Sequence, residues 1–230
     1  MIKWNVGLKI GMGFALAIAP LAIIGGVAYL SIGKLTETAA WVDHTQKVLV
    51  TIEDTLSTLK DAETGQRGYL LTGNDKYLEP FQSAQVAIDQ KLRALRELTK
   101  DNDHQQRRLD AREPLISGPD GKFAELLQTI NLRKDKDRGF EAALELVRTD
   151  KGKNVMDAIR RILGEMTDEE NSLLKLRAAD ADASARSARW TIIGGTLGAL
   201  AILALTGFII TRNIAIPLRE ITGIAGQIAV

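Results

Sequence analysis

The chain has 230 residues, of which 30 are basic, 29 are acidic, two are histidines and none is cysteine. The lack of cysteine excludes disulfides and thiolate chemistry, and the even balance of charge leaves no strongly basic surface for nucleic acid. The charges are unevenly placed, because residues 10–30 and 190–210 carry none. Each of these segments is close to the ~20 residues that an α-helix needs to cross ~30 Å of hydrocarbon. The sequence therefore predicts two transmembrane helices.

The first apolar segment has some features of a cleaved signal peptide, since it follows a basic N-terminus and contains the small residues Ala17 and Ala19. Pro20 would block cleavage there, so we interpret the segment as an uncleaved membrane anchor. Two basic residues precede the first span and two follow the second: Lys3, Lys9, Arg212 and Arg219. Positive charge at both short ends indicates cytoplasmic termini, which leaves residues 31–189 periplasmic or extracellular.

The first helix is predicted to continue out of the membrane, because its apolar residues keep a heptad spacing. One seam position holds Leu35, Val42, Leu49 and Leu56, and the other holds Ile52 and Leu59. Gly73 is suited to the positive φ of a helix C-cap, and Asn74 or Asp75 can cap the next helix. We therefore expect a helix corner at residues 71–75.

Three further helical regions are predicted after this corner. The second helix runs from residue 77 or 80 to 100, and the third covers 105–133 with a turn-forming interruption at 117–121. A short helix at 139–148 leads into the last long helix, which runs into the second span. The sequence shows no strand signal, so the predicted fold class is all-α, a membrane-anchored up-down four-helix bundle.

The predicted domains follow from these elements: a cytoplasmic N-terminus at 1–9, a transmembrane helix at 10–30, a periplasmic bundle at 31–189, a second transmembrane helix at 190–211 and a cytoplasmic helix at 212–230. No catalytic residue, metal site or cofactor is expected. The two histidines, His44 and His104, are far apart in the sequence, and Gly152-Lys153 lacks the rest of a phosphate-binding loop.

Polar residues interrupt the seam of the first helix near its end. Extending the heptad places Glu63 and Gln66 inward, and a buried carboxylate needs a donor, water or a proton. One hypothesis is a polar layer of Glu63, Gln66 and Arg67 that fixes helix register, with Glu169 or Glu170 as the partner of Arg67. The alternative is a pocket in which Arg67 binds an anionic group of an unknown periplasmic ligand.

Glycines off the seam are interpreted as sites of close approach. Gly65 and Gly68 cost about 1 kcal/mol each relative to alanine in a helix, so we expect them to admit a neighbouring helix or a second subunit. In the spans, Gly194 and Gly198 have the four-residue spacing of helix-packing motifs, within one subunit or between two.

The C-terminal stretch "ITRNIAIPLREITGIAGQIAV" repeats isoleucine every seven residues, which favours a parallel helix partner over a helix lying on the membrane. It resembles the first helix of a HAMP domain, which Pro217 and Leu218 would open. The resemblance implies that Pro217, Leu218 and Ile221 relay a signal.

The middle segment resembles the third family of CHASE domains, extracytoplasmic sensory bundles of bacterial receptors. The residues that carry the resemblance are "DAETGQRGYLLTGNDKYLEPF", "RGFEAALELVRTDKGKNVMDAIRRI" and "EENSLLKLR". The likeness covers residues 31–189 except for the interruption at 117–121, which looks like an insertion.

Both resemblances imply a bacterial inner-membrane receptor. We expect these residues to form the sensory and transmembrane portion of a homodimer, which relays a periplasmic stimulus through the HAMP helix to a cytoplasmic output domain of the same chain. A histidine kinase of a two-component system is the commonest output, so the full-length protein would be an enzyme although these residues are not. The alternatives are a methyl-accepting chemotaxis receptor and a membrane-tethered helical scaffold that transmits no signal.

Overall fold

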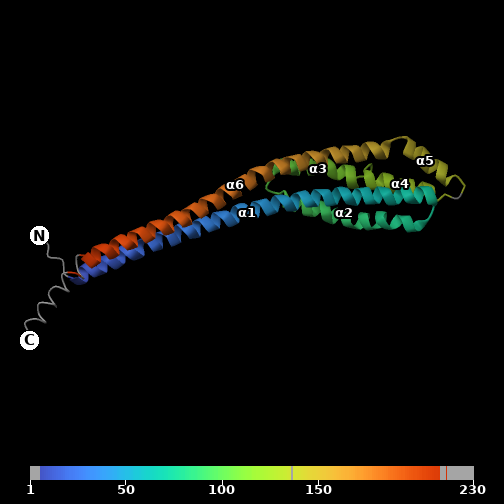
Figure 1. Ribbon diagram of the computed structural model, residues 1–230. Helices are drawn as coiled ribbons and strands as arrows, with labels where there is room; N and C mark the ends of the chain where they lie inside the picture. The colour runs from blue at the N-terminus through green and yellow to red at the C-terminus, as the bar shows by residue number, and fades with distance from the viewer. Residues whose placement is uncertain (1–5, 136, 213–215, 217–230) are drawn as a thin grey trace, which may run out of the picture. The chain divides into compact units, whose positions relative to one another are not determined.

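The computed structural model describes residues 6–135, 137–212 and 216, and these residues contain helices and no strand (Figure 1). The all-α prediction is therefore confirmed. The elements in chain order are α1 (Val6–Thr72), the 3-10 helix η1 (Asp75–Leu78), α2 (Glu79–Leu98), α3 (Asp103–Ser117), α4 (Lys122–Arg133), α5 (Gly139–Arg148) and α6 (Lys151–Ile210). The HAMP-like residues Pro217, Leu218 and Ile221 lie outside the described part of the chain.

The chain divides into two compact units. The bundle unit is Trp41–Arg177, and the paired-helix unit combines Met1–Ala40 with Ala178–Val230. Since the long helices α1 and α6 each contribute to both, the units are joined by continuous helix. The domain boundaries predicted at residues 31 and 189 stay predictions.

Four helical arms surround a single apolar core in the bundle unit (Figure 1). The arms are α1, α2, the pair α3 and α4, and α6. The interruption of the third arm falls at residues 118–121, as the turn chemistry predicts. Each arm contributes fully or almost fully buried side chains to the core, among them Ile52, Leu59, Leu95, Leu109, Ile116, Leu126, Ile159 and Met166.

The buried face of α1 differs in part from the predicted seam. Its two most buried heptad series are Thr45, Ile52, Leu59, Gln66 and Val48, Thr55, Ala62, Tyr69. Leu49 and Leu56 are only half-buried. The sequence pattern misses the two threonines because they are polar. They are tolerated because their hydroxyls donate to the carbonyls of Trp41 (2.9 Å) and Thr51 (2.7 Å) on their own helix.

The corner after α1 has the predicted caps. Gly73 adopts a φ of +69°, and its N–H donates to the Tyr69 carbonyl at 2.7 Å. The Asn74 side chain accepts from the backbone N–H of Lys76 at 3.1 Å. Arg133 of α4 donates from Nε to the Leu70 carbonyl at 2.8 Å, which satisfies another acceptor at the helix end.

The glycines near this corner face the returning chain. A Cβ on Gly65 would lie 2.7 Å from the Tyr77 carbonyl oxygen, and one on Gly68 would lie 2.5 Å from Cδ1 of the Tyr77 ring. Both distances are too short for ordinary contact, so only glycine lets Tyr77 pack against α1. The interpretation of these glycines as sites of close approach is confirmed.

The paired-helix unit exposes many large apolar side chains, among them Phe14, Ile23, Leu30, Leu197 and Phe208. The parts of α1 and α6 in this unit are long and apolar enough to cross a membrane. The two helices come close together at Gly195, where an added Cβ would lie 3.0 Å from Ile24. Gly195 is not one of the two glycines predicted for helix packing. A Cβ on Gly194 or Gly198 would meet nothing within 4 Å in the described structure.

The close approach at Gly65 predicts a large effect of a single methyl group. Gly65→Ala should lower the free energy of unfolding by about 1–3 kcal/mol, because the added Cβ meets a backbone oxygen that cannot move alone. Gly164→Ala is the matched control: Gly164 is exposed in α6 with open space around its Cα, so the variant should gain up to about 1 kcal/mol. Thermal unfolding followed by circular dichroism in detergent micelles measures both. Equal stability of the two variants would contradict the packing described.

Candidate functional site

A layer of buried charges connects three arms of the bundle near the corner. Lys122 of α4 is 2% exposed, and its Nζ lies 3.0 Å from Oε2 of Glu125 and 3.7 Å from Oε1 of Glu63. The same Nζ donates to the Gly152 carbonyl of α6 at 3.2 Å. A buried cation is stabilised only by such closely placed acceptors. The layer therefore fixes the positions of α1, α4 and α6 relative to one another along the bundle.

Glu63 and Gln66 are buried on the inner face of α1, as predicted. Glu63 also accepts from Arg67 at 2.6 Å, while the Arg67 side chain itself is exposed. Nε2 of Gln66 has no hydrogen-bond partner among the described residues. The sequence did not identify Lys122 or Glu125, because they begin a helix whose position across the bundle depends on the preceding turn.

The predicted pairing of Arg67 with Glu169 or Glu170 is wrong. Lys122 contacts both Glu63 and the Gly152 carbonyl, so the part of α6 that lies beside Glu63 is near Gly152. Glu169 is seventeen residues further along α6, about 25 Å at 1.5 Å per residue. Arg67 instead pairs with Glu63 on its own helix.

Glu169 and Glu170 belong to a second polar layer, between α6 and the start of α3. Glu169 accepts from Nδ2 of Asn102 at 2.8 Å and forms a short ion pair with Arg108. Burial alone would raise the pKa of Glu169, but these two donors outweigh it and lower the pKa. Glu170, 3% exposed, accepts from Nε2 of Gln105 at 2.8 Å. Here burial dominates and raises the pKa of the Glu170 carboxyl.

Arg112 of α3 is a buried cation that forms no ion pair with another described residue. Its side chain is fully buried, Nη1 contacts Sδ of Met166 at 3.6 Å, and Nε and Nη2 have no hydrogen-bond partner among the described residues. Burial lowers the pKa of this guanidinium to about 10. The position costs stability, since a desolvated charge is costly where nothing compensates it.

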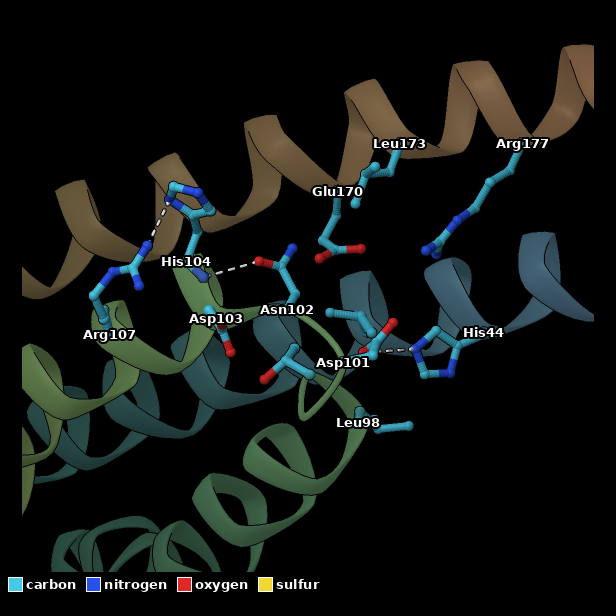
Figure 2. Close-up of a pocket in the computed structure, with 12 residues that line it drawn as sticks. His44, Leu98, Asp101, Asn102, Asp103, His104, Arg107, Glu170, Leu173 and Arg177 are labelled. Carbon is cyan, nitrogen blue, oxygen red and sulfur yellow. Dashed lines mark hydrogen bonds and ion pairs between the residues drawn. The ribbon is translucent and has the colours of Figure 1, made fainter.

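A cavity of about 430 Å³ lies between α1, the turn that joins α2 to α3, and α6 (Figure 2). Its lining carries the charged or titratable side chains of His44, Asp101, Asp103, His104, Arg107, Glu170 and Arg177. Glu170, Leu173 and Arg177 project into it from α6, and Asp101 and His44 approach from the other side (Figure 2). The volume is within the range of pockets for small molecules.

The charged groups of the cavity are held by few bonds. Nε2 of His44 lies 3.8 Å from Oδ1 of Asp101, and Nδ1 of His104 lies 3.1 Å from Nη2 of Arg107. Nη1 of Arg177 donates to Oγ1 of Thr45 at 2.5 Å, and its guanidinium lies over the Trp41 ring, 4.6 Å from the centroid. Arg177 is thereby positioned at the edge of the cavity by groups of α1.

Of the predicted site candidates that the structure describes, only Glu170 lines this cavity. The sequence separates the two histidines by sixty residues, yet the fold brings both of them to this cavity together with residues 101–103. Asn102 does cap α3, since its Oδ1 accepts from the backbone N–H of His104 at 3.0 Å. Nothing in the sequence distinguishes Arg177 from the other charged residues of α6. The described residues contain no group of three His, Asp or Glu side chains placed to hold a metal ion.

The bundle unit is a helical bundle whose first and last helices continue into apolar segments long enough to cross a membrane. The family model of the CHASE3 domain matches residues 38–180, and the chain belongs to this family of extracellular sensor domains. The crystal structure of the histidine kinase HK9 sensor domain from Rhodopseudomonas palustris is similar, with 27% identity and a TM-score of 0.50. The match covers 57% of this chain and 98% of that one. Comparison with curated proteins yields no match.

The two buried cations predict opposite effects of the same substitution. Arg112→Met should raise the free energy of unfolding by about 1–4 kcal/mol, because it removes an uncompensated buried charge and keeps an apolar chain of similar length. Lys122→Met should lower it by about 3–5 kcal/mol, because it leaves Glu63 and Glu125 buried without their cation. Thermal unfolding of both variants in detergent tests the contrast. Destabilisation by Arg112→Met would mean that the guanidinium has a compensating partner.

The raised pKa of Glu170 predicts a pH dependence of stability. Since the folded-state pKa exceeds the ordinary value of 4.5, the folded chain binds more protons than the unfolded chain between the two values. The free energy of unfolding of the wild type should therefore fall, relative to Glu170→Gln, as the pH rises through this window. Urea titrations of both proteins at a series of pH values measure the difference. A difference that rises with pH would contradict the assignment.

Proposed function

We propose that these residues form the sensory and transmembrane portion of a homodimeric bacterial receptor, two-pass in the inner membrane with both termini in the cytoplasm. The CHASE3 membership and the similarity to a histidine kinase sensor domain support a role in signalling. The output proposed is a histidine kinase of a two-component system, reached through a HAMP helix that Pro217, Leu218 and Ile221 begin. A chemotaxis receptor with the same sensory half is the alternative output.

The observation that carries the proposal is the continuity of α1 and α6. Each helix contributes core residues to the bundle unit, Ile52 in α1 and Ile159 in α6, and continues without a break into an apolar segment. A helix resists axial compression because every turn is hydrogen-bonded to the next. A shift or rotation of one long helix against the other is therefore carried along its length.

A second copy of the chain is proposed as the partner. The exposed face of α6 near Gly194 and Gly198 leaves open space beside two small residues four apart, which permits close approach of another transmembrane helix. A dimer would place two copies of each cytoplasmic helix in parallel, the arrangement that the isoleucine repeat after the second span favours.

Insertions in α6 test the relay. The chain is fused after Val230, in phase with the isoleucine repeat, to the catalytic half of a histidine kinase whose autophosphorylation is measured in membranes. One alanine inserted after Arg186 rotates the following helix by about 100° and should change the basal activity several-fold.

Seven residues inserted at the same site are the matched control, because they keep the helix phase within about 20° and should leave activity close to that of the parent. A scaffold that transmits no signal predicts the same activity for both insertions. That outcome would contradict the proposed receptor function.

A further inference from the structure

We propose that the cavity lined by Glu170 and Arg177 binds a small zwitterion with an excess of positive charge, of the class of the linear diamino acids. The proposal rests on the proposed receptor function only in making this cavity the place where a stimulus acts. The binding itself is a property of the bundle unit.

The charge of the cavity selects this class. Its lining holds the carboxylates of Asp101, Asp103 and Glu170 against the guanidiniums of Arg107 and Arg177, so the net charge is −1 with both histidines neutral. A ligand with two ammonium groups and one carboxylate complements both the net charge and the presence of both signs. An anionic ligand would meet the three carboxylates at close range, where like charges repel.

The positions of the charges match an elongated molecule. Glu170 and Arg177 project from the same side of α6 and are seven residues apart, which separates their backbones by about 10 Å (Figure 2). Glu170 lies opposite Asp101, whereas Arg177 lies towards α1 (Figure 2). A ligand ammonium is therefore assigned to the carboxylates of Glu170 and Asp101, and the ligand carboxylate to Arg177.

Free bonding capacity is present at both ends. Glu170 uses only Oε1, towards Gln105, and Arg177 uses Nη1, towards Thr45, in the bonds found among the described residues. Arg177 is also fixed over the Trp41 ring, so little side-chain entropy is lost when its remaining nitrogens bind a carboxylate. A charge-assisted contact at each end gives the site its specificity.

The ligand would contact three segments at once. The cavity is formed by α1, by the turn at residues 99–102 with the start of α3, and by α6, and Arg177 is already bonded to α1. Binding between Asp101 on the turn and Glu170 on α6 would favour one placement of these segments over others. The free energy available for a shift is the difference in ligand affinity between the two placements.

Calorimetric titration of the purified chain in detergent micelles at pH 7 tests the site, with L-lysine as the probe. Saturable binding is expected, with at least a tenfold loss of affinity in Glu170→Gln and in Arg177→Ala. Arg161→Ala is the matched control, because Arg161 lies on the same helix, is exposed and pairs with Glu165 outside the cavity. Its affinity should equal that of the wild type.

Cadaverine, which has the two ammonium groups of lysine but no carboxylate, separates recognition from folding. It should bind more weakly than lysine to the wild type and equally well to the wild type and Arg177→Ala. Absence of saturable lysine binding, or equal loss of both ligands in Arg177→Ala, would overturn the proposal. Because no output is measured, this failure is distinct from failure of the insertion experiment.

Discussion

The interaction on which the bundle depends is the set of contacts around the ammonium group of Lys122. A cation that is 2% exposed is stable only while its acceptors stay in place, and these acceptors come from three arms: Glu63 of α1, Glu125 of α4 and the Gly152 carbonyl of α6. Apolar side chains tolerate small sliding movements, whereas an ion pair in a dry interior does not. The layer therefore fixes which residues of the three arms lie side by side across the bundle. This alignment in turn determines which apolar side chains meet in the core.

The sequence is sufficient to predict what depends on local spacing. Heptads and turn residues predict the helices, the corner at Gly73 and the inward direction of Glu63 and Gln66, because each of these is decided within a few residues of the chain. Partners across the bundle were not predictable in the same way. The pairing of Arg67 with Glu169 failed because the level of α6 is set by the lengths of α4, α5 and their turns. Thr45 and Thr55 were missed because a hydroxyl bonded to its own helix looks polar in the sequence but packs as an apolar group.

The two ends of the bundle unit differ in how their charges are compensated. At the corner, Lys122 and Glu63 satisfy one another, and the glycines at 65 and 68 let Tyr77 close tightly on α1. Towards the cavity, Nε and Nη2 of Arg112 have no hydrogen-bond partner among the described residues, and burial disfavours the charged form of Glu170. Uncompensated buried charge costs free energy, so the cavity end gains less from its polar groups than the corner does. Sensory coupling needs only ~1–3 kcal/mol between two packings, and the cavity end has contacts of that order to gain or lose.

The interruption of the third arm has a mechanical consequence. Between Ser117 and Lys122 the helical ladder of hydrogen bonds is broken, and only local turn contacts such as Gly121 to the Gly118 carbonyl, 2.9 Å, join α3 to α4. The backbone of this joint has fewer hydrogen bonds than a continuous helix, so α3 and α4 are coupled less rigidly than two turns of one helix. Of the four arms, only α1 and α6 continue as unbroken rods from the level of Lys122 past the level of the cavity. The two helices that continue into the apolar segments are thus also the two whose hydrogen-bonded backbone is unbroken along the bundle.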